Sequence, residues 1–86
     1  MHETLNQELS DYIKLLRFKK KYSQEEVAKK IGITRNTYSI WENKPVALSL
    51  ETLVNLFDVF EEDALIFFKK YVAKSNEQET QKEKEE

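Results

Sequence analysis

Apolar residues recur along most of the chain at intervals of three and four positions, the spacing that gathers them on one side of an α-helix. These stripes predict helices over about residues 5–20, 24–31, 35–43, 50–60 and 64–74. One glycine, one proline and few β-branched runs favour an all-α fold. The residues expected to face inward are Leu5, Leu9, Tyr12, Ile13 and Leu16, then Val27, Ala28 and Ile31, then Ile33, Tyr38 and Trp41, and finally Leu50, Leu53, Leu56, Phe57 and Phe60.

Polar residues at the ends of these stripes predict where the helices begin and stop. Ser23 followed by Glu26 forms a capping box at the start of the second helix. Gly32 supplies the positive φ with which helices often end. Pro45 disfavours helix at Lys44 and predicts a loop there. The other expected N-caps are Thr34, Ser49 and Asp63.

Length and composition restrict the class of protein. A chain of 86 residues predicts one domain with a small core. The absence of cysteine excludes disulfides, thiol catalysis and cysteine-based zinc sites. No apolar run approaches the ~18 residues that a membrane span requires. The polar, acidic N-terminus is not a signal peptide, so we expect a cytoplasmic protein without membrane contact.

Charge is segregated along the chain, although the net charge is only -2. Residues 1–13 carry three acidic residues and no lysine or arginine. Residues 14–44 carry nine basic residues against three acidic ones, and residues 45–86 carry five against ten. The basic block covers the second and third predicted helices, and a local basic surface is what binding to duplex DNA requires.

The third predicted helix has an outer side suited to reading bases. We expect Tyr38 and Trp41, three positions apart, to share the inner side of this helix, and residues 34–37 and 40 to lie on its outer side. A helix of this kind fits the major groove, where its first residues meet base edges. Arg35 matches the O6 and N7 atoms of guanine, and Asn36 matches N6 and N7 of adenine. Thr34 joins this polar group, while Thr37 and Ile40 offer methyl groups to thymine.

Residues flanking this helix suit contacts with phosphate. Gln24 opens the second helix, where its amide and a backbone N–H would lie near the DNA backbone. Asn43 and Lys44 at the end of the third helix, with Lys29, are further candidates. The run 19–21 of three lysines suits phosphate contact and solvent exposure equally well.

The helix-turn-helix and its surroundings resemble a known family. Residues 17–65 are similar to the lambda-repressor/Cro type of helix-turn-helix, also called the XRE family. The matching positions are Arg17, Gln24, Ala28, Gly32, Arg35, Trp41, Glu42, Leu53 and Leu56. The resemblance implies a five-helix DNA-binding domain over residues 1–74, with the helix-turn-helix at about 23–43. It also implies a repressor that binds as a dimer and needs no cofactor.

The resemblance assigns roles to particular residues. It places DNA contacts on Gln24, Arg35, Asn36, Thr37, Ile40 and Asn43. It implies a structural pair of Arg17 and Glu42, which ties the first helix to the end of the third. Two positions depart from the family pattern: Lys44 stands where a glycine is usual, and Leu48 where a proline is usual. We therefore expect the loop after the third helix to follow a different path.

The fifth predicted helix, at about 63–74, is apolar on all sides for more than a turn. A peripheral helix buries only one side, and the exposed remainder usually marks a partner surface. We expect a homodimer contact here, formed by Ile66, Phe67, Phe68 and Tyr71. Such a dimer would present two recognition helices about 34 Å apart, one turn of DNA. Residues 75–86 contain no apolar residue and are expected to form a disordered acidic tail.

Three classes of function compete. The leading hypothesis is a sequence-specific regulator of transcription, a repressor that binds double-stranded DNA at a palindromic operator. The alternative is an antitoxin or co-regulator, whose main role is to bind a regulatory protein partner through the fifth helix and the tail. An enzyme is disfavoured, because the chain has no cysteine, one histidine and no glycine-rich phosphate loop. The lone His2 gives no reason to expect a metal.

Overall fold

The computed structural model describes residues 2–73, and within this range the regular secondary structure is entirely helical, with no strand. The elements are α1 (His2–Lys20), α2 (Gln24–Ile31), α3 (Arg35–Asn43), the short 3-10 helix η1 (Pro45–Ala47) and α4 (Leu50–Val59). A C-terminal helix follows over residues 64–73. The predicted end of that helix at 74 and the predicted tail at 75–86 lie outside the described residues.

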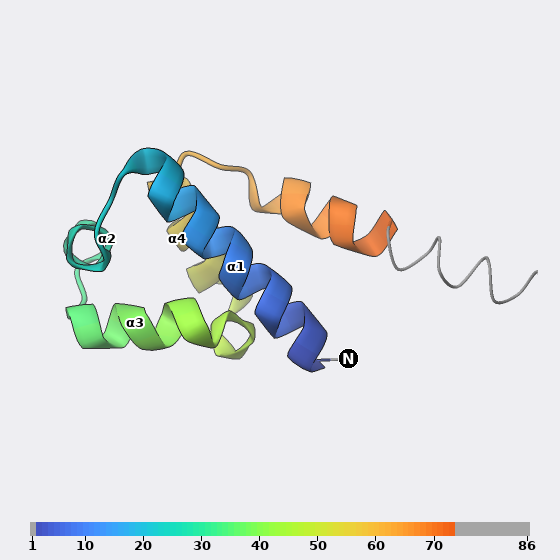
Figure 1. Ribbon diagram of the computed structural model, residues 1–86, viewed down its shortest axis with the longest axis horizontal. Coiled ribbons are helices and arrows are strands. Elements are labelled where there is room, and N and C mark those ends of the chain that lie inside the picture. Colours follow the sequence, from blue (N-terminus) through green and yellow to red (C-terminus); the bar gives the residue numbers. More distant parts are fainter. Residues whose placement is uncertain (1, 74–86) are drawn as a thin grey trace, which may run out of the picture.

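The long helix α1 crosses the domain, with α3 on one side of it and the C-terminal helix on the other (Figure 1). It starts at His2, three residues before the predicted start at Leu5. The prediction was short because the apolar stripe begins only at Leu5, whereas the first turn of an exposed helix needs no apolar residue. None of the helices among the described residues is long and apolar enough to cross a membrane.

The helix-turn-helix has the bounds that its capping residues predict. The Ser23 hydroxyl accepts a hydrogen bond from the Glu26 N–H at 3.1 Å, and the Glu26 carboxylate accepts one from the Ser23 N–H at 3.1 Å. The helix ends at Gly32, whose φ of 91° is left-handed. Nothing lies within 4 Å of the position of a Cβ on Gly32, so the backbone conformation, not space, favours glycine there.

The other helix ends combine predicted and unexpected features. Ser49 caps α4 through the N–H of Thr52, and the Asp63 carboxylate accepts a hydrogen bond from the N–H of Leu65 at 2.9 Å. α4 stops at Val59, one residue before the predicted end. The chain reverses there because Glu61 adopts a left-handed conformation with φ of 56°, which lets the Glu62 N–H reach the Phe57 carbonyl.

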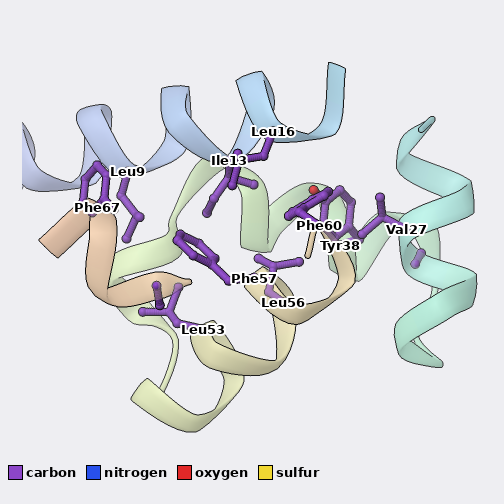
Figure 2. Packing of buried hydrophobic residues seen from close by; sticks show 12 residues of the cluster. Leu9, Ile13, Leu16, Val27, Tyr38, Leu53, Leu56, Phe57, Phe60 and Phe67 are labelled. Carbon is purple, nitrogen blue, oxygen red and sulfur yellow. The ribbon is translucent and has the colours of Figure 1, made fainter. Parts of the chain in front are cut away.

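The four helices α1 to α4 and the C-terminal helix all contribute to one core (Figure 2). Side chains of α1 form its roof, and Phe57 of α4 points up toward Ile13. Tyr38 brings α3 into the same cluster and Val27 brings in α2. The fully or nearly buried apolar residues are Leu9, Ile13, Leu16, Val27, Ala28, Tyr38, Leu53, Leu56, Phe57, Phe60, Ala64 and Phe67.

Two predicted core residues, Leu50 and Trp41, do not join the core, whereas Leu5, Tyr12, Ile31 and Ile33 are partly buried against it. Leu50 is 69% exposed, because it lies in the first turn of α4 at the edge of the apolar stripe, where no neighbouring helix covers it. Trp41 is only half-buried, and its neighbour Glu42 takes the buried position one turn after Tyr38. Positions three and four residues beyond Tyr38 both lie near its side of α3. The apolar pattern therefore predicted that Trp41 is buried, whereas the fold buries the Glu42 carboxylate.

Candidate nucleic-acid interface

The end of α3 is fixed to α1 by an ion pair. The Arg17 guanidinium donates from Nε to Glu42 Oε2 at 2.8 Å and from Nη2 to Oε1 at 3.1 Å. Its third donor, Nη1, bonds the Tyr22 carbonyl at 3.1 Å. The side chains are 12% and 1% exposed, so the pair is largely removed from water. A bidentate contact of this kind fixes direction as well as distance, and it sets the angle between the two helices.

Gln24 joins this pair at the start of α2. Its Nε2 donates to Glu42 Oε1 at 3.3 Å, so the predicted phosphate ligand already has an internal partner. An amide nitrogen carries two hydrogens, and the second remains available to a phosphate. The Glu42 carboxylate thus connects the end of α3 with the end of α1 and the start of α2. The sequence resemblance implied the arginine but gave no sign of the Gln24 contact.

Burial and charge in this network shift the pKa values of Glu42, Arg17 and Tyr38. Burial alone would raise the pKa of Glu42, but the hydrogen bonds from Arg17 and Gln24, together with the nearby Tyr38 hydroxyl, outweigh burial and lower it. The carboxylate in turn raises the pKa of Arg17. Burial, followed by the adjacent carboxylate, raises the pKa of Tyr38 well above its ordinary value. The Tyr38 hydroxyl is buried beside the pair without a hydrogen bond of standard geometry to a described residue.

Two more polar residues of α1 hold the last turn of α3, and sequence reasoning missed both. The buried Ser10 hydroxyl donates to the Glu42 carbonyl at 2.6 Å. Asn6 donates to the Asn43 carbonyl at 3.0 Å and accepts from the Val46 N–H at 3.3 Å. These bonds satisfy carbonyl groups that the end of a helix leaves without partners. The sequence does contain a signal for these contacts, because Asn6, Ser10 and Arg17 form a polar line at helical spacing beside the apolar stripe.

The outer side of α3 is exposed. The side chains of Arg35 and Asn36 project from its first turn, and neither makes a hydrogen bond or ion pair with the described residues. Ile40, one turn further, is 63% exposed, a high fraction for an isoleucine. A shallow hollow next to it is lined by Ser39, Ile40, Asn43 and Lys44. The helix therefore carries free donors and an apolar side chain on one face.

Other predicted contact residues are partly engaged within the chain. The Thr34 hydroxyl accepts from the Thr37 N–H at 3.2 Å and donates to the Thr37 hydroxyl at 2.9 Å, so its first role is to cap α3. Thr37 is half-buried and keeps its own hydroxyl hydrogen. The Asn43 amide bonds the Ser39 carbonyl of its own helix at 2.9 Å. Lys44, beside it, is charged and exposed.

The lysines around the helix-turn-helix differ in what they face. Lys19, Lys21 and Lys29 are exposed. Lys20, by contrast, pairs with Glu61 at 3.1 Å, and Lys30 lies over the Tyr22 ring at 5.0 Å. The described residues hold no group of three or more His, Cys, Asp or Glu side chains that would bind a metal ion.

The four residues predicted for a dimer contact do not share one exposed surface. Phe67 is only 8% exposed and packs its ring 5.0 Å from that of Tyr12, so it faces the core and not the outer surface on which the dimer contact was expected. Phe68 and Tyr71 are half-buried beside it, whereas Ile66 is exposed. Residues two apart on a helix point in nearly opposite directions, which separates Ile66 from Phe68. A helix apolar on all sides gives no pattern from which to infer its inner side. The exposed residues that sequence reasoning missed are Leu65 and Val72.

Comparison with known proteins adds one finding to this geometry. A family model described as helix-turn-helix matches residues 13–66, which is more than half of the chain. The match begins in α1 at the buried Ile13 and ends in the C-terminal helix at Ile66, so it includes the ion pair and the exposed side of α3. No curated protein and no solved structure matches the chain.

Proposed function

Because the chain belongs to the helix-turn-helix family of the lambda-repressor/Cro type and is thereby a DNA-binding regulator of transcription, we propose that it is a sequence-specific repressor. In this proposal it binds a palindromic operator as a dimer and excludes the polymerase by occupying that site. Its place of action is the cytoplasm, where the operator would be reached directly.

One observation carries the proposal: α3 is rigidly held at its inner side while its outer donors are free. Glu42 and Tyr38 are buried, whereas Arg35 and Asn36 are exposed and have no partner among the described residues. A side chain that discriminates between bases must be held by its backbone and unused by its own protein. Each good bidentate contact to a base discriminates by about 1–3 kcal/mol.

Contacts with phosphate would orient this helix in the groove. The free N–H groups at the start of α2 and the second amide hydrogen of Gln24 would meet one phosphate. Lys44 and Lys29, both exposed, would neutralise others. Asn43 would offer its second amide hydrogen, because the Ser39 carbonyl accepts only the first. Ile40 would contact a thymine methyl group.

The dimer would form through the outward side of the C-terminal helix. Ile66 lies there together with Leu65 and Val72, and all three are at least 41% exposed. Phe68 and Tyr71 would lie at the margin of this contact, and Phe67 would support it from below. Burial of these aliphatic side chains across a two-fold axis would join two copies of the chain. Half-sites one turn of DNA apart would require their α3 helices to lie about 34 Å apart.

Selection from a randomised pool of DNA duplexes tests base reading. The wild type is expected to enrich a palindrome with half-sites about ten base pairs apart. A variant with Arg35→Ala and Asn36→Ala is expected to lose that enrichment while keeping its helical circular dichroism. A matched variant with Glu51→Ala and Asn55→Ala, two exposed positions on α4, is expected to select the same palindrome. Absence of enrichment by the wild type would rule out sequence-specific binding.

Sedimentation equilibrium tests the dimer separately. The wild type is expected to dimerise at tens of micromolar, and Ile66→Glu to be a monomer of unchanged helicity. Val46→Glu serves as a control, because Val46 is equally exposed but lies in η1, outside the proposed contact. A monomeric wild type, or a dimer that persists in Ile66→Glu, would contradict this part of the proposal.

A further inference from the structure

A groove lies between α4 and the C-terminal helix, next to the connection that joins them. Its apolar lining comes from Leu50 and Val54 of α4 and from Leu65 and Phe68 of the C-terminal helix. Leu50 and Leu65 are 69% and 60% exposed. Because both line one groove, they form an exposed apolar patch and are not scattered surface residues. In Figure 1 the C-terminal helix and α3 lie on opposite sides of α1, which leaves this surface clear of the base-reading helix.

The border of this groove is acidic. Asp58, Glu61, Glu62 and Asp63 line it, and no lysine or arginine is among its lining residues. Lys20 neutralises Glu61, and the Asp63 carboxylate is directed to the Leu65 N–H. Asp58 and Glu62 remain as negative charges beside the apolar floor. Charged groups at the border of an apolar site select partners of opposite charge and steer their approach.

We propose that this groove receives an amphipathic helix of another protein, apolar along one side and bordered by lysine or arginine. The shape of the site favours a helix, because both walls are helices and neither offers a strand edge to an extended peptide. A helical partner brings a backbone that is already hydrogen-bonded, so only its side chains need to fit. The apolar stripe covers Leu50, Val54 and Leu65, and the basic residues face Asp58 and Glu62.

Neither the same groove on a second copy nor the sequence of the chain's own tail has this chemistry. A two-fold contact of this groove with itself would bring two acidic borders together, and like charges in contact are costly. The tail at residues 75–86 contains five glutamates, two lysines and no apolar residue, so it matches neither the floor nor the border. Charge complementarity therefore selects a basic partner.

The test is a peptide selection on the full chain. A displayed library of helical peptides carries fixed leucines at helical spacing and randomised residues beside them. Lysine and arginine are expected to be enriched at the randomised positions. The tightest peptide is then synthesised with a fluorescent label, and its Kd is measured by anisotropy. Leu50→Ser with Val54→Ser, and separately Asp58→Lys with Glu62→Lys, are each expected to weaken binding about ten-fold or more.

Two controls keep the result specific to the groove. Val46→Ser removes an equally exposed apolar side chain elsewhere and is expected to leave the Kd unchanged. The substitutions at the apolar floor are confined to α4, because Leu65 also belongs to the surface proposed for the dimer. The α4 variants are expected to select the same DNA as the wild type, so failure of this inference and failure of the proposed function would be told apart.

Three outcomes would overturn the inference. One is enrichment of acidic or unbiased residues beside the leucines. Another is a Kd that Leu50→Ser with Val54→Ser leaves unchanged. The last is a homodimer that these two substitutions dissociate in sedimentation, which would assign the groove to a second copy of the chain.

Discussion

Helix α3 and the C-terminal helix are both attached to α1, but by different kinds of contact. α3 is attached through directed polar bonds, from Arg17 to Glu42 and from Ser10 to the Glu42 carbonyl. The C-terminal helix is attached through rings, with Phe67 packed against Tyr12 at 5.0 Å. Hydrogen bonds fix an orientation within a narrow range of angles, whereas ring packing allows a wider range, because the hydrophobic effect itself has no direction.

This difference fits what each helix presents outward. α3 exposes hydrogen-bond donors, which discriminate between bases only if the helix is held at one angle. The C-terminal helix exposes aliphatic side chains at Leu65, Ile66 and Val72, and such surfaces tolerate small shifts of a partner. We therefore expect damage to the polar contacts to disturb the whole domain, and damage to the C-terminal helix to remain more local.

The largest effect is expected from breaking the ion pair. Arg17→Met leaves Glu42 buried without its main partner, which should lower the free energy of unfolding by about 3–5 kcal/mol. Arg35→Met removes the same charge from an exposed site and should change it by at most about 0.5 kcal/mol. Urea unfolding followed by circular dichroism measures both. A cost below about 1 kcal/mol for Arg17→Met would mean that the polar bonds do not dominate the attachment of α3.

The same pair predicts how stability depends on pH. In the folded protein the pKa of Glu42 is lowered from its ordinary value of 4.5. The stabilisation is therefore fully present above that value and is lost as pH falls through the lower, folded pKa. Urea midpoints between pH 6 and pH 3 should fall more steeply for the wild type than for Glu42→Gln, which has no carboxylate to protonate. Parallel slopes would contradict the assignment.

Removing a buried side chain from the C-terminal helix should lower the free energy of unfolding less, and its effect should be more local. Phe67→Ala removes a buried ring and should cost about 3 kcal/mol, the low end for such changes, since the helix is peripheral. Its exposed neighbour gives the matched control: Ile66→Ser should cost about 0.5 kcal/mol or less in the monomer. Hydrogen exchange should show faster opening of residues 64–73 in Phe67→Ala, with α2 and α3 still protected. Equal loss of protection in all helices would remove the distinction between the two regions.

The smallest effects are expected from removing the N-cap side chains of the two regions. Ser23→Ala removes one half of the capping box of α2 and should lower the global free energy of unfolding by about 1 kcal/mol. Asp63→Ala removes the cap of the C-terminal helix. It should change hydrogen exchange at residues 64–73 more than it changes the urea midpoint. If Asp63→Ala lowered the midpoint as much as Ser23→Ala, the C-terminal helix would be part of the same cooperative unit.

Local signals explain which parts of the fold the sequence predicts well. Ser23, Glu26, Gly32 and Thr34 act on the backbone within four residues, so α2 and α3 have the predicted bounds. Apolar periodicity also places α1 and α4 and most of the core. Both kinds of signal are local, and neither depends on how the helices meet in space.

Features that depend on the meeting of helices were harder to predict. The periodicity of α3 does not distinguish Trp41 from Glu42 as the buried residue, because the choice depends on Arg17 lying opposite. The C-terminal helix is apolar on all sides, so only its contact with Tyr12 selects Phe67 as the inner residue. At the candidate site, Arg35 and Asn36 are exposed as predicted, whereas the internal bonds of Gln24 and Asn43 depend on tertiary geometry.

The most direct test of the central claim, that the outer side of α3 reads bases, is a set of four affinities measured at one salt concentration. Wild type and Asn36→Ala are each titrated onto the selected palindrome and onto a scrambled duplex. The account predicts that Asn36→Ala binds the palindrome about ten-fold more weakly and the scrambled duplex equally well. Equal weakening on both duplexes would show that Asn36 contacts only the DNA backbone, and it would contradict base reading by α3.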